Sequence, residues 1–247
     1  MSDPRPTNPF STSAVPAAVP AEVDAPPAIQ VDARTQQAFL TQAFLWMFVG
    51  LAVTAAIAYI VQSNERLLEF AANNLLILII AQLGIVFAIG LGIRRISATA
   101  ALGLFFVYAA SLGVTMGLIV SAYTQASVAT AFVSSSAMFG AAAIYGHVTK
   151  RSLARIGSLL FMALIGLLVA MIVNLFLRND MASFVISIIG VVIFTGLTAW
   201  DVQRIQNGQL AVYTGSVEKA AVMGALTLYL DFINLFLFML RLFGGRN

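Results

Sequence analysis

Two aspartates lie where acids are rarely found in a sequence. Asp201 ends an uncharged run that begins at Met181, and Asp231 lies inside an apolar stretch, residues 220–240. About ten residues separate Asp231 from the start of that stretch, or roughly 15 Å at helical rise. A carboxylate at such a depth in a bilayer is costly, and it marks a functional site when a partner can be named. We predict that Asp201 is the partner of Asp231.

Polar residues around both acids recur at helical spacing. Thr227, Asp231 and Asn234 share one face of a helix, and Thr198 shares a face with Asp201. Carboxylate, hydroxyl and amide oxygens are the ligands that calcium accepts. We therefore predict a weak calcium site at Asp201 and Asp231, with Thr198, Thr227 and Asn234 on a candidate ion path. A calcium-storage site would need more acids than two.

The two carboxyl groups also predict a response to protons. Two neighbouring carboxylates in a low dielectric cannot both ionise easily, so they should titrate as a unit. A simpler alternative exists for Asp201, which could be a boundary residue paired with Arg204, three positions further on. Asp231 has no such neighbour in sequence.

The composition places these residues in a membrane. Hydrophobic residues make up 60% of the chain and charged residues 9%, with a mean hydropathy of +0.95, values typical of polytopic membrane proteins. The net charge of +3 comes from basic residues in short segments between apolar runs, so we expect a lipid bilayer and no nucleic acid as partner. The absence of cysteine and the single histidine argue against zinc and iron centres. We expect no cofactor, only calcium as a transported ion.

The apolar runs predict an all-α polytopic membrane protein with seven transmembrane helices, because each run is long enough to cross a bilayer. The runs are 39–61, 75–93, 100–121, 128–145, 158–177, 181–200 and 220–240. The third and fourth are divided at a predicted turn, residues 121–127. Residues 38–247 would form the transmembrane domain, and residues 1–37, with all seven prolines, are predicted to be a disordered tail that is no signal peptide.

The basic residues predict the orientation in the membrane. With seven spans, one side carries nine of the thirteen basic residues, and these are Arg5, Arg34, Arg94, Arg95, Lys150, Arg151, Arg155, Arg204 and Lys219. The other four, Arg66, Arg178, Arg241 and Arg246, lie on the opposite side. The positive-inside rule then predicts a cytoplasmic N-terminus and an exported C-terminus.

Several segments resemble the Bax inhibitor-1 (transmembrane Bax inhibitor motif) family, and its prokaryotic members in particular. TGLTAWDVQRIQ, at residues 195–206, is similar to the end of the family's sixth helix, and ALTLYLDFINLFLFMLRLFG, at residues 225–244, to its seventh. The resemblance covers residues 39–244. It implies a seven-helix bundle with the seventh helix central, in the bacterial inner membrane, and a pH-sensing aspartate pair that gates a calcium leak.

By these motifs the aspartate pair corresponds to Asp201 and Asp231. The family's second helix often carries a glutamate followed by an arginine that pairs with the aspartates. Gln82 stands where that glutamate is expected, and Arg94 or Arg95 can supply the arginine. We expect ionised Asp201 to latch the second helix through one of these arginines, and moderate acid to release it.

Two other functions remain open from the sequence. The resemblance also implies a non-conducting modulator of other membrane machinery, such as a membrane-anchored ATP-dependent protease. An enzyme is less favoured, because aspartyl intramembrane proteases show a Gly-x-Gly-Asp pattern, and here Leu228 and Leu230 hold the glycine positions before Asp231. No Gly-x-Ser-x-Gly motif of serine hydrolases occurs either. We therefore expect no catalytic residues.

Overall fold

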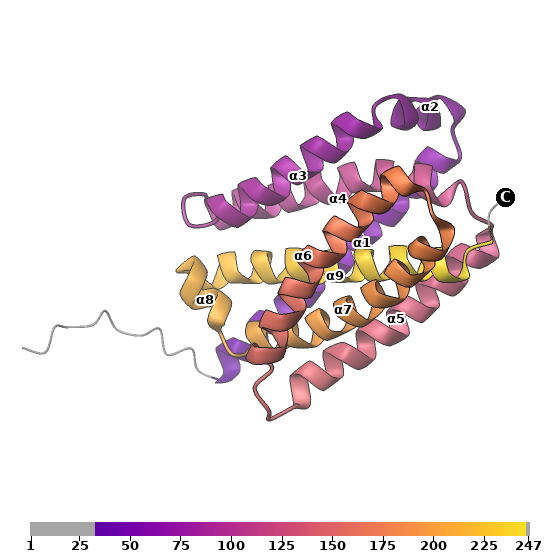
Figure 1. The fold of residues 1–247 in the computed structure, drawn as a ribbon. Coiled ribbons are helices and arrows are strands. Elements are labelled where there is room, and N and C mark those ends of the chain that lie inside the picture. Colours follow the sequence, from indigo (N-terminus) through magenta and orange to yellow (C-terminus); the bar gives the residue numbers. More distant parts are fainter. Residues whose placement is uncertain (1–32, 246–247) are drawn as a thin grey trace, which may run out of the picture. The chain divides into compact units, whose positions relative to one another are not determined.

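The computed structural model describes residues 33–245, and every regular element in this part of the chain is an α-helix (Figure 1). Seven helices are long and apolar enough to cross a membrane. They are α1 (Ala33–Gln62), α3 (Leu75–Gly92), α4 (Ala98–Val120), α5 (Gln125–Val148), α6 (Ala154–Leu177), α7 (Asp180–Gln206) and α9 (Val217–Phe243). The predicted all-α membrane architecture with seven spans is confirmed.

Polar residues at the helix starts explain several boundaries. The predicted turn at residues 121–127 lies between α4 and α5, where the Thr124 hydroxyl oxygen accepts a hydrogen bond from the Ser127 amide. Ser97, Asn179 and Ser216 cap α4, α7 and α9 in the same way. Such caps satisfy amide groups that have no partner within the helix. They let each chain reversal occur within a few residues.

Some boundaries differ from the prediction. The sixth span does not end at Trp200, because α7 continues to Gln206 and holds Asp201 inside the helix. Two short helices, α2 (Glu65–Asn73) and α8 (Gln209–Thr214), were not predicted. The first helix begins at Ala33, within the predicted tail. The remaining residues of that tail, 1–32, lie outside the described part of the chain.

The long helices differ greatly in burial. In α9, 78% of the most apolar window is buried inside the protein, against 11% in α3 and in α6. The α9 helix packs against α1, α4, α5, α7 and α8, and Figure 1 shows it running between α4 and α7. By contrast, α3 packs mainly on α4, and α6 on α7. A polar side chain on α9 therefore has protein neighbours rather than lipid.

Glycines allow the close packing around α9. A Cβ atom at Gly113 or Gly117 of α4 would lie within 3 Å of α1 atoms, including the carbonyl oxygens of Thr54 and Ala58. A Cβ atom at Gly146 of α5 would overlap the backbone of Ala199 in α7. Small residues of this kind let membrane helices approach backbone to backbone. They fix how far each helix stands from its neighbours.

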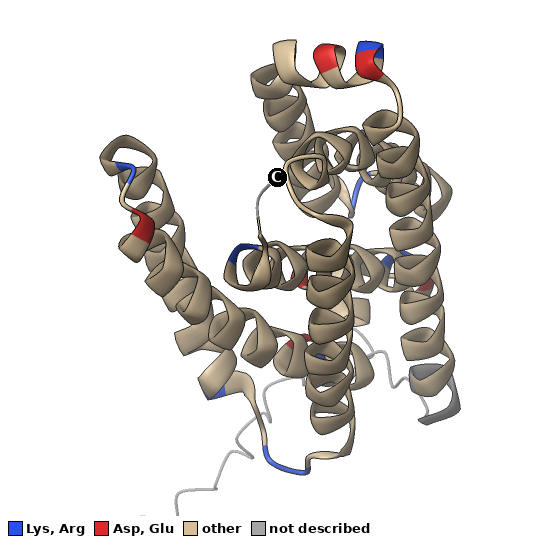
Figure 2. Cartoon of the chain, turned by 90° about the vertical axis from the view of Figure 1, so that its right-hand side faces the viewer, with Lys and Arg blue, Asp and Glu red and all other residues tan. Residues whose placement is uncertain are grey.

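Successive long helices run in opposite directions, so the bundle has two ends (Figure 1). We call the end where α4, α6 and α9 begin the basic end, and the opposite end the far end. Lys150, Arg151 and Arg155 lie in or beside the α5–α6 loop at the basic end. Figure 2 shows how sparse charged residues are along the helices, and the α5–α6 loop stands out in blue. The charged residues on α7 and α9 that lie away from the helix ends are therefore exceptional.

Candidate functional site: a carboxyl pair between α7 and α9

Asp201 of α7 and Asp231 of α9 meet inside the bundle. Their exposed fractions are 6% and 4%, and their carboxyl groups lie within hydrogen-bonding reach of each other. The α7 and α9 helices pack closely, and both acids face this contact. The structure thus brings together the two aspartates that the sequence analysis singled out.

The closeness of the two acids makes it costly to ionise both. Ionised carboxyl groups have only acceptor atoms, so two of them can hydrogen-bond only when one is protonated. Oδ2 of Asp231 is buried and has no hydrogen-bond partner. A buried polar atom without a partner is rare and calls for an explanation. An acid with an unpartnered oxygen, next to a second acid, can take up a proton or a cation.

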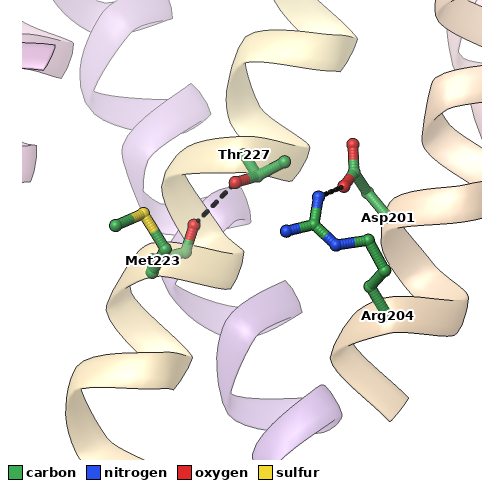
Figure 3. A network of polar contacts seen from close by, with 4 residues as sticks. All are labelled: Asp201, Arg204, Met223 and Thr227. Atoms are coloured by element: carbon green, nitrogen blue, oxygen red, sulfur yellow. Dashed lines mark hydrogen bonds and ion pairs between the residues drawn. The ribbon is translucent and has the colours of Figure 1, made fainter. Parts of the chain in front are cut away.

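Arg204 supplies the cation beside this pair. Its Nη1 atom donates a hydrogen bond of 2.9 Å to Oδ1 of Asp201, one helical turn away on α7 (Figure 3). The guanidinium group also lies 4.4 Å from the centre of the Trp200 ring, a cation–π contact. The pairing with Arg204 is the simpler alternative raised by the sequence. The Asp201 side chain is nevertheless only 8% exposed, so it is not a boundary residue in water.

Arg94 and Arg95 do not reach the carboxyl pair in this conformation. Both are exposed, just beyond the end of α3. Among the described side chains, residues 37–245, the only ion pair joins Asp201 to Arg204. The α3 end is held instead by the carbonyl oxygen of Arg94, which accepts a hydrogen bond of 3.3 Å from Lys219 Nζ. The predicted latch from the second span therefore stays a prediction.

Gln82 joins two helices and does not contact the carboxyl pair. It is buried on α3, and its Nε2 atom donates to the Ser111 carbonyl oxygen at 3.1 Å and to the Thr115 hydroxyl oxygen at 2.8 Å. Both partners belong to α4. A neutral amide at this position fixes α3 to α4 without adding a charge.

The predicted polar stripe keeps its oxygen atoms available as acceptors. Thr198 and Thr227 donate their hydroxyl protons to the carbonyl oxygens one turn earlier in their own helices, at 2.8 and 3.0 Å. Asn234 Nδ2 donates to the Leu230 carbonyl oxygen at 2.8 Å. Each side-chain oxygen keeps lone pairs that can accept a hydrogen bond or face a cation. Figure 3 shows Thr227 across from the Arg204 guanidinium group.

Two further residues position the site and were missed by sequence reasoning. Gln203 Oε1 accepts from the Leu153 amide at 2.8 Å, and its Nε2 donates to the Arg151 carbonyl oxygen at 2.9 Å, so it holds the α5–α6 loop against α7. The Trp200 ring lies against Gly157 of α6, where a Cβ atom would overlap it. Both lie within the segment 195–206, but their partners are distant in sequence. No local pattern could have identified them.

The two acids have few other metal-ligating side chains around them. Among the described residues, no group of three or more His, Cys, Asp or Glu side chains gathers at one place. Calcium sites in proteins use six to eight oxygen ligands, several of them carboxylates. Two carboxyl groups with a competing arginine would hold calcium weakly.

Comparisons with known proteins agree on one family. The model of the family described as inhibitor of apoptosis-promoting Bax1 matches residues 36–247. The inner membrane protein YbhL of Escherichia coli K12 is 42% identical over 217 residues, covering 85% of this chain and 93% of its own. An uncharacterised protein of Deinococcus radiodurans is 43% identical over 210 residues, covering 85% and 91%, and one of Borreliella burgdorferi is 40% identical over 214 residues, covering 85% and 92%.

Proposed function

The chain belongs to the Bax inhibitor-1 family, and from this premise we propose that it is a pH-sensitive cation leak, with calcium as the transported ion. The observation that carries the proposal is the buried contact between Asp201 and Asp231, with one unpartnered carboxyl oxygen. Acids inside a membrane bundle are costly and mark ion or proton pathways. We further propose that the protein has no enzymatic activity and needs no cofactor.

The proton is proposed to act through Arg204. With one proton on the pair, Asp201 can stay ionised and hold the guanidinium group while Asp231 stays neutral. A second proton discharges Asp201, and Arg204 then loses its ionic partner. Arginine cannot give up its own proton in a protein, so its charge must find another acceptor. We expect the α7–α9 contact to loosen, which opens the path in moderate acid.

Stronger acid should limit the flux. A fully protonated pair has no negative charge to attract calcium, so passage should weaken again as the pH falls further. The flux is therefore expected to pass through a maximum. The threonine and asparagine oxygens along α7 and α9 would give the ion polar contacts on either side of the pair.

The latch to α3 is proposed as a second state of the same switch. In the described conformation Asp201 is paired with Arg204, and Arg94 and Arg95 lie at the exposed end of α3. A movement of α3 that brings either arginine to Asp201 would replace Arg204 as counter-ion. Because Gln82 and Lys219 hold α3, such a movement must break their hydrogen bonds.

We also propose an orientation and a location. The excess of basic residues at the basic end supports an orientation in which that end faces the cytoplasm. A relative that bears the name inner membrane protein supports the bacterial inner membrane as the location. Activity of reporter proteins fused at residue 247 tests this, since an odd number of spans puts the C-terminus outside.

Calcium flux into liposomes tests the function. The purified chain is reconstituted with a calcium dye inside the vesicles, and initial flux is measured from alkaline to acidic pH. Asp201→Asn mimics the protonated state and should give flux that no longer depends on pH. Asp231→Asn should lower cation passage. Asp180→Asn is the matched control, because Asp180 starts the same helix α7 but is exposed at the far end, and it should behave as wild type.

The outcomes separate the two functions left open by the sequence. A leak in protein-only liposomes requires no partner, so a modulator of a membrane-anchored protease would show none. If both aspartate variants fold and leak calcium with the wild-type pH profile, the pair is structural and does not gate the leak. If the wild-type chain shows no leak at any pH, the modulator becomes the leading function.

A further inference from the structure

A second feature of the bundle lies away from the carboxyl pair. A cavity of about 340 Å³ opens at the far end, between α1, α4, α5 and α9. Its inner wall is apolar and includes Leu51, Ala55, Met116, Phe232, Ile233 and Phe236. No acidic or basic residue lines it. The cavity is therefore suited to hydrocarbon rather than to an ion.

Polar groups in the cavity lie mainly at its outer rim. Gln62 is the last residue of α1, and Gln125 is the first residue of α5. Tyr59 and Tyr123 lie near these two helix ends. Helix ends of a membrane protein reach the level of the lipid headgroups, where tyrosine is favoured. The wall is thus polar at headgroup level and apolar deeper in the membrane.

The deep end offers no polar group to a ligand. The hydroxyl group of Thr54, which lines the cavity, already contacts the Tyr229 hydroxyl group and the carbonyl oxygens of Gly50 and Ala109. A buried water needs two to four polar partners, so a continuous water path through this end is not favoured. The occupant must be apolar here.

Aromatic rings close the cavity toward the basic end. The Phe232 ring packs edge to face on Phe132 and Phe139, with centres 5.8 and 5.6 Å apart. Phe139 in turn meets Phe44 of α1 at 6.4 Å. The cavity therefore ends inside the membrane and does not continue to the carboxyl pair.

The walls of the cavity are also open to the surrounding lipid. Phe132 on α5 lines the cavity and is 53% exposed. In a chain that crosses the membrane, exposed apolar surface at this depth is in contact with acyl chains. A chain from the bilayer can reach the cavity without passing through water.

We propose that this cavity binds one acyl chain of a bilayer phospholipid, with its headgroup near Gln62 and Gln125. An engineered apolar cavity of about 150 Å³ holds one benzene molecule, so about twice that volume holds roughly a dozen carbon atoms. This matches the deeper part of one acyl chain. Because the rim has no charged residue, it should not distinguish headgroups by their charge. Both zwitterionic and anionic phospholipids should therefore bind.

The bound chain would brace α9 beside the carboxyl pair. Phe232 and Ile233 line the cavity and directly follow Asp231 in the same helix. The lipid would therefore support the helix that carries the buried acid. Binding itself does not depend on calcium passage, so the test below stands apart from the proposed leak.

Native mass spectrometry of the purified chain tests the binding. Delipidated protein in mild detergent is titrated with dioleoyl phosphatidylglycerol or dioleoyl phosphatidylcholine, and bound copies are counted. For each of the two lipids, we expect one bound lipid molecule per protein that is retained more strongly than any further molecule. Ala55→Phe, which adds a ring to the α1 wall, should weaken this retention about tenfold, or about 1.4 kcal/mol. Ala129→Phe adds a ring to the α5 wall and should weaken retention in the same way. It replaces Ala55→Phe in the test if that variant folds poorly.

Matched controls lie one turn or less away. Ala56 and Ala126 are exposed alanines on α1 and α5 that do not line the cavity, and Ala56→Phe and Ala126→Phe should retain lipid as wild type does. Loss of retention in these controls, or equal retention in all four variants, would overturn the proposal. Preferential retention of oleic acid or lysophosphatidylcholine would overturn the choice of a phospholipid.

Tryptophan fluorescence places the chain within the protein. Phe236→Trp puts an indole in the cavity wall, and Phe238→Trp puts one at a buried position on α9 that does not line it. Phospholipids brominated on the acyl chain should quench the first more than the second. Equal quenching of both would contradict binding in the cavity.

Discussion

Two polar clusters lie on α9, only two residues apart, and they are satisfied to different degrees. The Tyr229 hydroxyl group contacts the Thr54 hydroxyl group at 2.5 Å, and Thr54 also lies 2.9 Å from the Ala109 carbonyl oxygen. Phe105 and Tyr108 pack their rings edge to face on Tyr229. Asp231, by contrast, keeps an oxygen with no hydrogen-bond partner.

The two clusters have different roles: the first is structural, and the second is proposed to exchange protons or ions. A fully satisfied buried network rigidifies the fold, because any change leaves a polar group unpaired. The first cluster, which we call the hydroxyl cluster, consists of Thr54, Tyr229 and the Ala109 carbonyl group, and it joins α1, α4 and α9 in this way. The carboxyl pair contains an unsatisfied group and a buried charge, which cost stability, and the proposed function would explain them by exchange with protons or ions. Four variants test this difference between the two clusters.

Removing the cation from the carboxyl pair should have the largest effect on stability. Arg204→Gln leaves Asp201 ionised without a partner, and breaking a buried ion pair costs about 3–5 kcal/mol. We expect the lower end, about 3 kcal/mol or less, because the Arg204 side chain is 29% exposed. The loss should be greatest at alkaline pH and should shrink in acid, where Asp201 is neutral. Thermal unfolding in detergent across pH measures this.

Arg94→Gln and Arg95→Gln are the controls for Arg204→Gln. Both side chains are exposed at the α3 end and should change unfolding little at any pH. A pH-dependent loss in either of them, and none in Arg204→Gln, would identify the predicted latch as the dominant state.

Breaking the hydroxyl cluster should have the second-largest effect on stability. Thr54→Val keeps the side-chain shape but leaves the buried Tyr229 hydroxyl group without its partner, which costs about 1–3 kcal/mol. Because no charge is involved, the loss should be the same at neutral and mildly acidic pH. Thermal unfolding at both conditions checks it, and a strong pH dependence would contradict a purely structural cluster.

Removing the Tyr229 hydroxyl group should lower the free energy of unfolding less than Thr54→Val does. Tyr229→Phe keeps the ring contacts with Phe105 and Tyr108, and Thr54 can still donate to the Gly50 or Ala109 carbonyl oxygen. One hydrogen bond is lost and no donor is left unpaired, so we expect about 0.5–1.5 kcal/mol. A larger loss than that of Thr54→Val in the same unfolding assay would show that the two hydroxyl groups are not one cluster.

The smallest change in stability is expected for Asp231→Asn. The asparagine amide can donate a hydrogen bond to ionised Asp201, so the pair needs no added proton. The free energy of unfolding at neutral pH should therefore equal or slightly exceed that of wild type. The same variant is expected to lower calcium passage. Unchanged stability with impaired flux would mark a functional group, whereas a destabilised variant with normal flux would place Asp231 with the hydroxyl cluster.

Hydrophobic periodicity alone predicts the membrane architecture and draws attention to the two acids. Seven apolar runs of sufficient length are enough, because a helix is the structure that satisfies its own backbone in lipid. The depth of Asp231 and the helical spacing of Thr227 and Asn234 followed from the same periodicity. Arg204 was visible three positions after Asp201, but its spacing alone could not decide whether it or an α3 arginine is the partner.

Tertiary structure decided which side chains meet. The Thr54–Tyr229 contact joins residues 175 positions apart, and Gln203 holds a loop 50 positions away, so neither has a local pattern. Such contacts depend on the rotation and separation of whole helices, which glycines such as Gly113, Gly117 and Gly146 set through close packing. Hydrophobic periodicity determines that a helix crosses the membrane and which face is polar. Only the packed bundle determines that Asp231 faces Asp201 and that one of its oxygens stays without a partner.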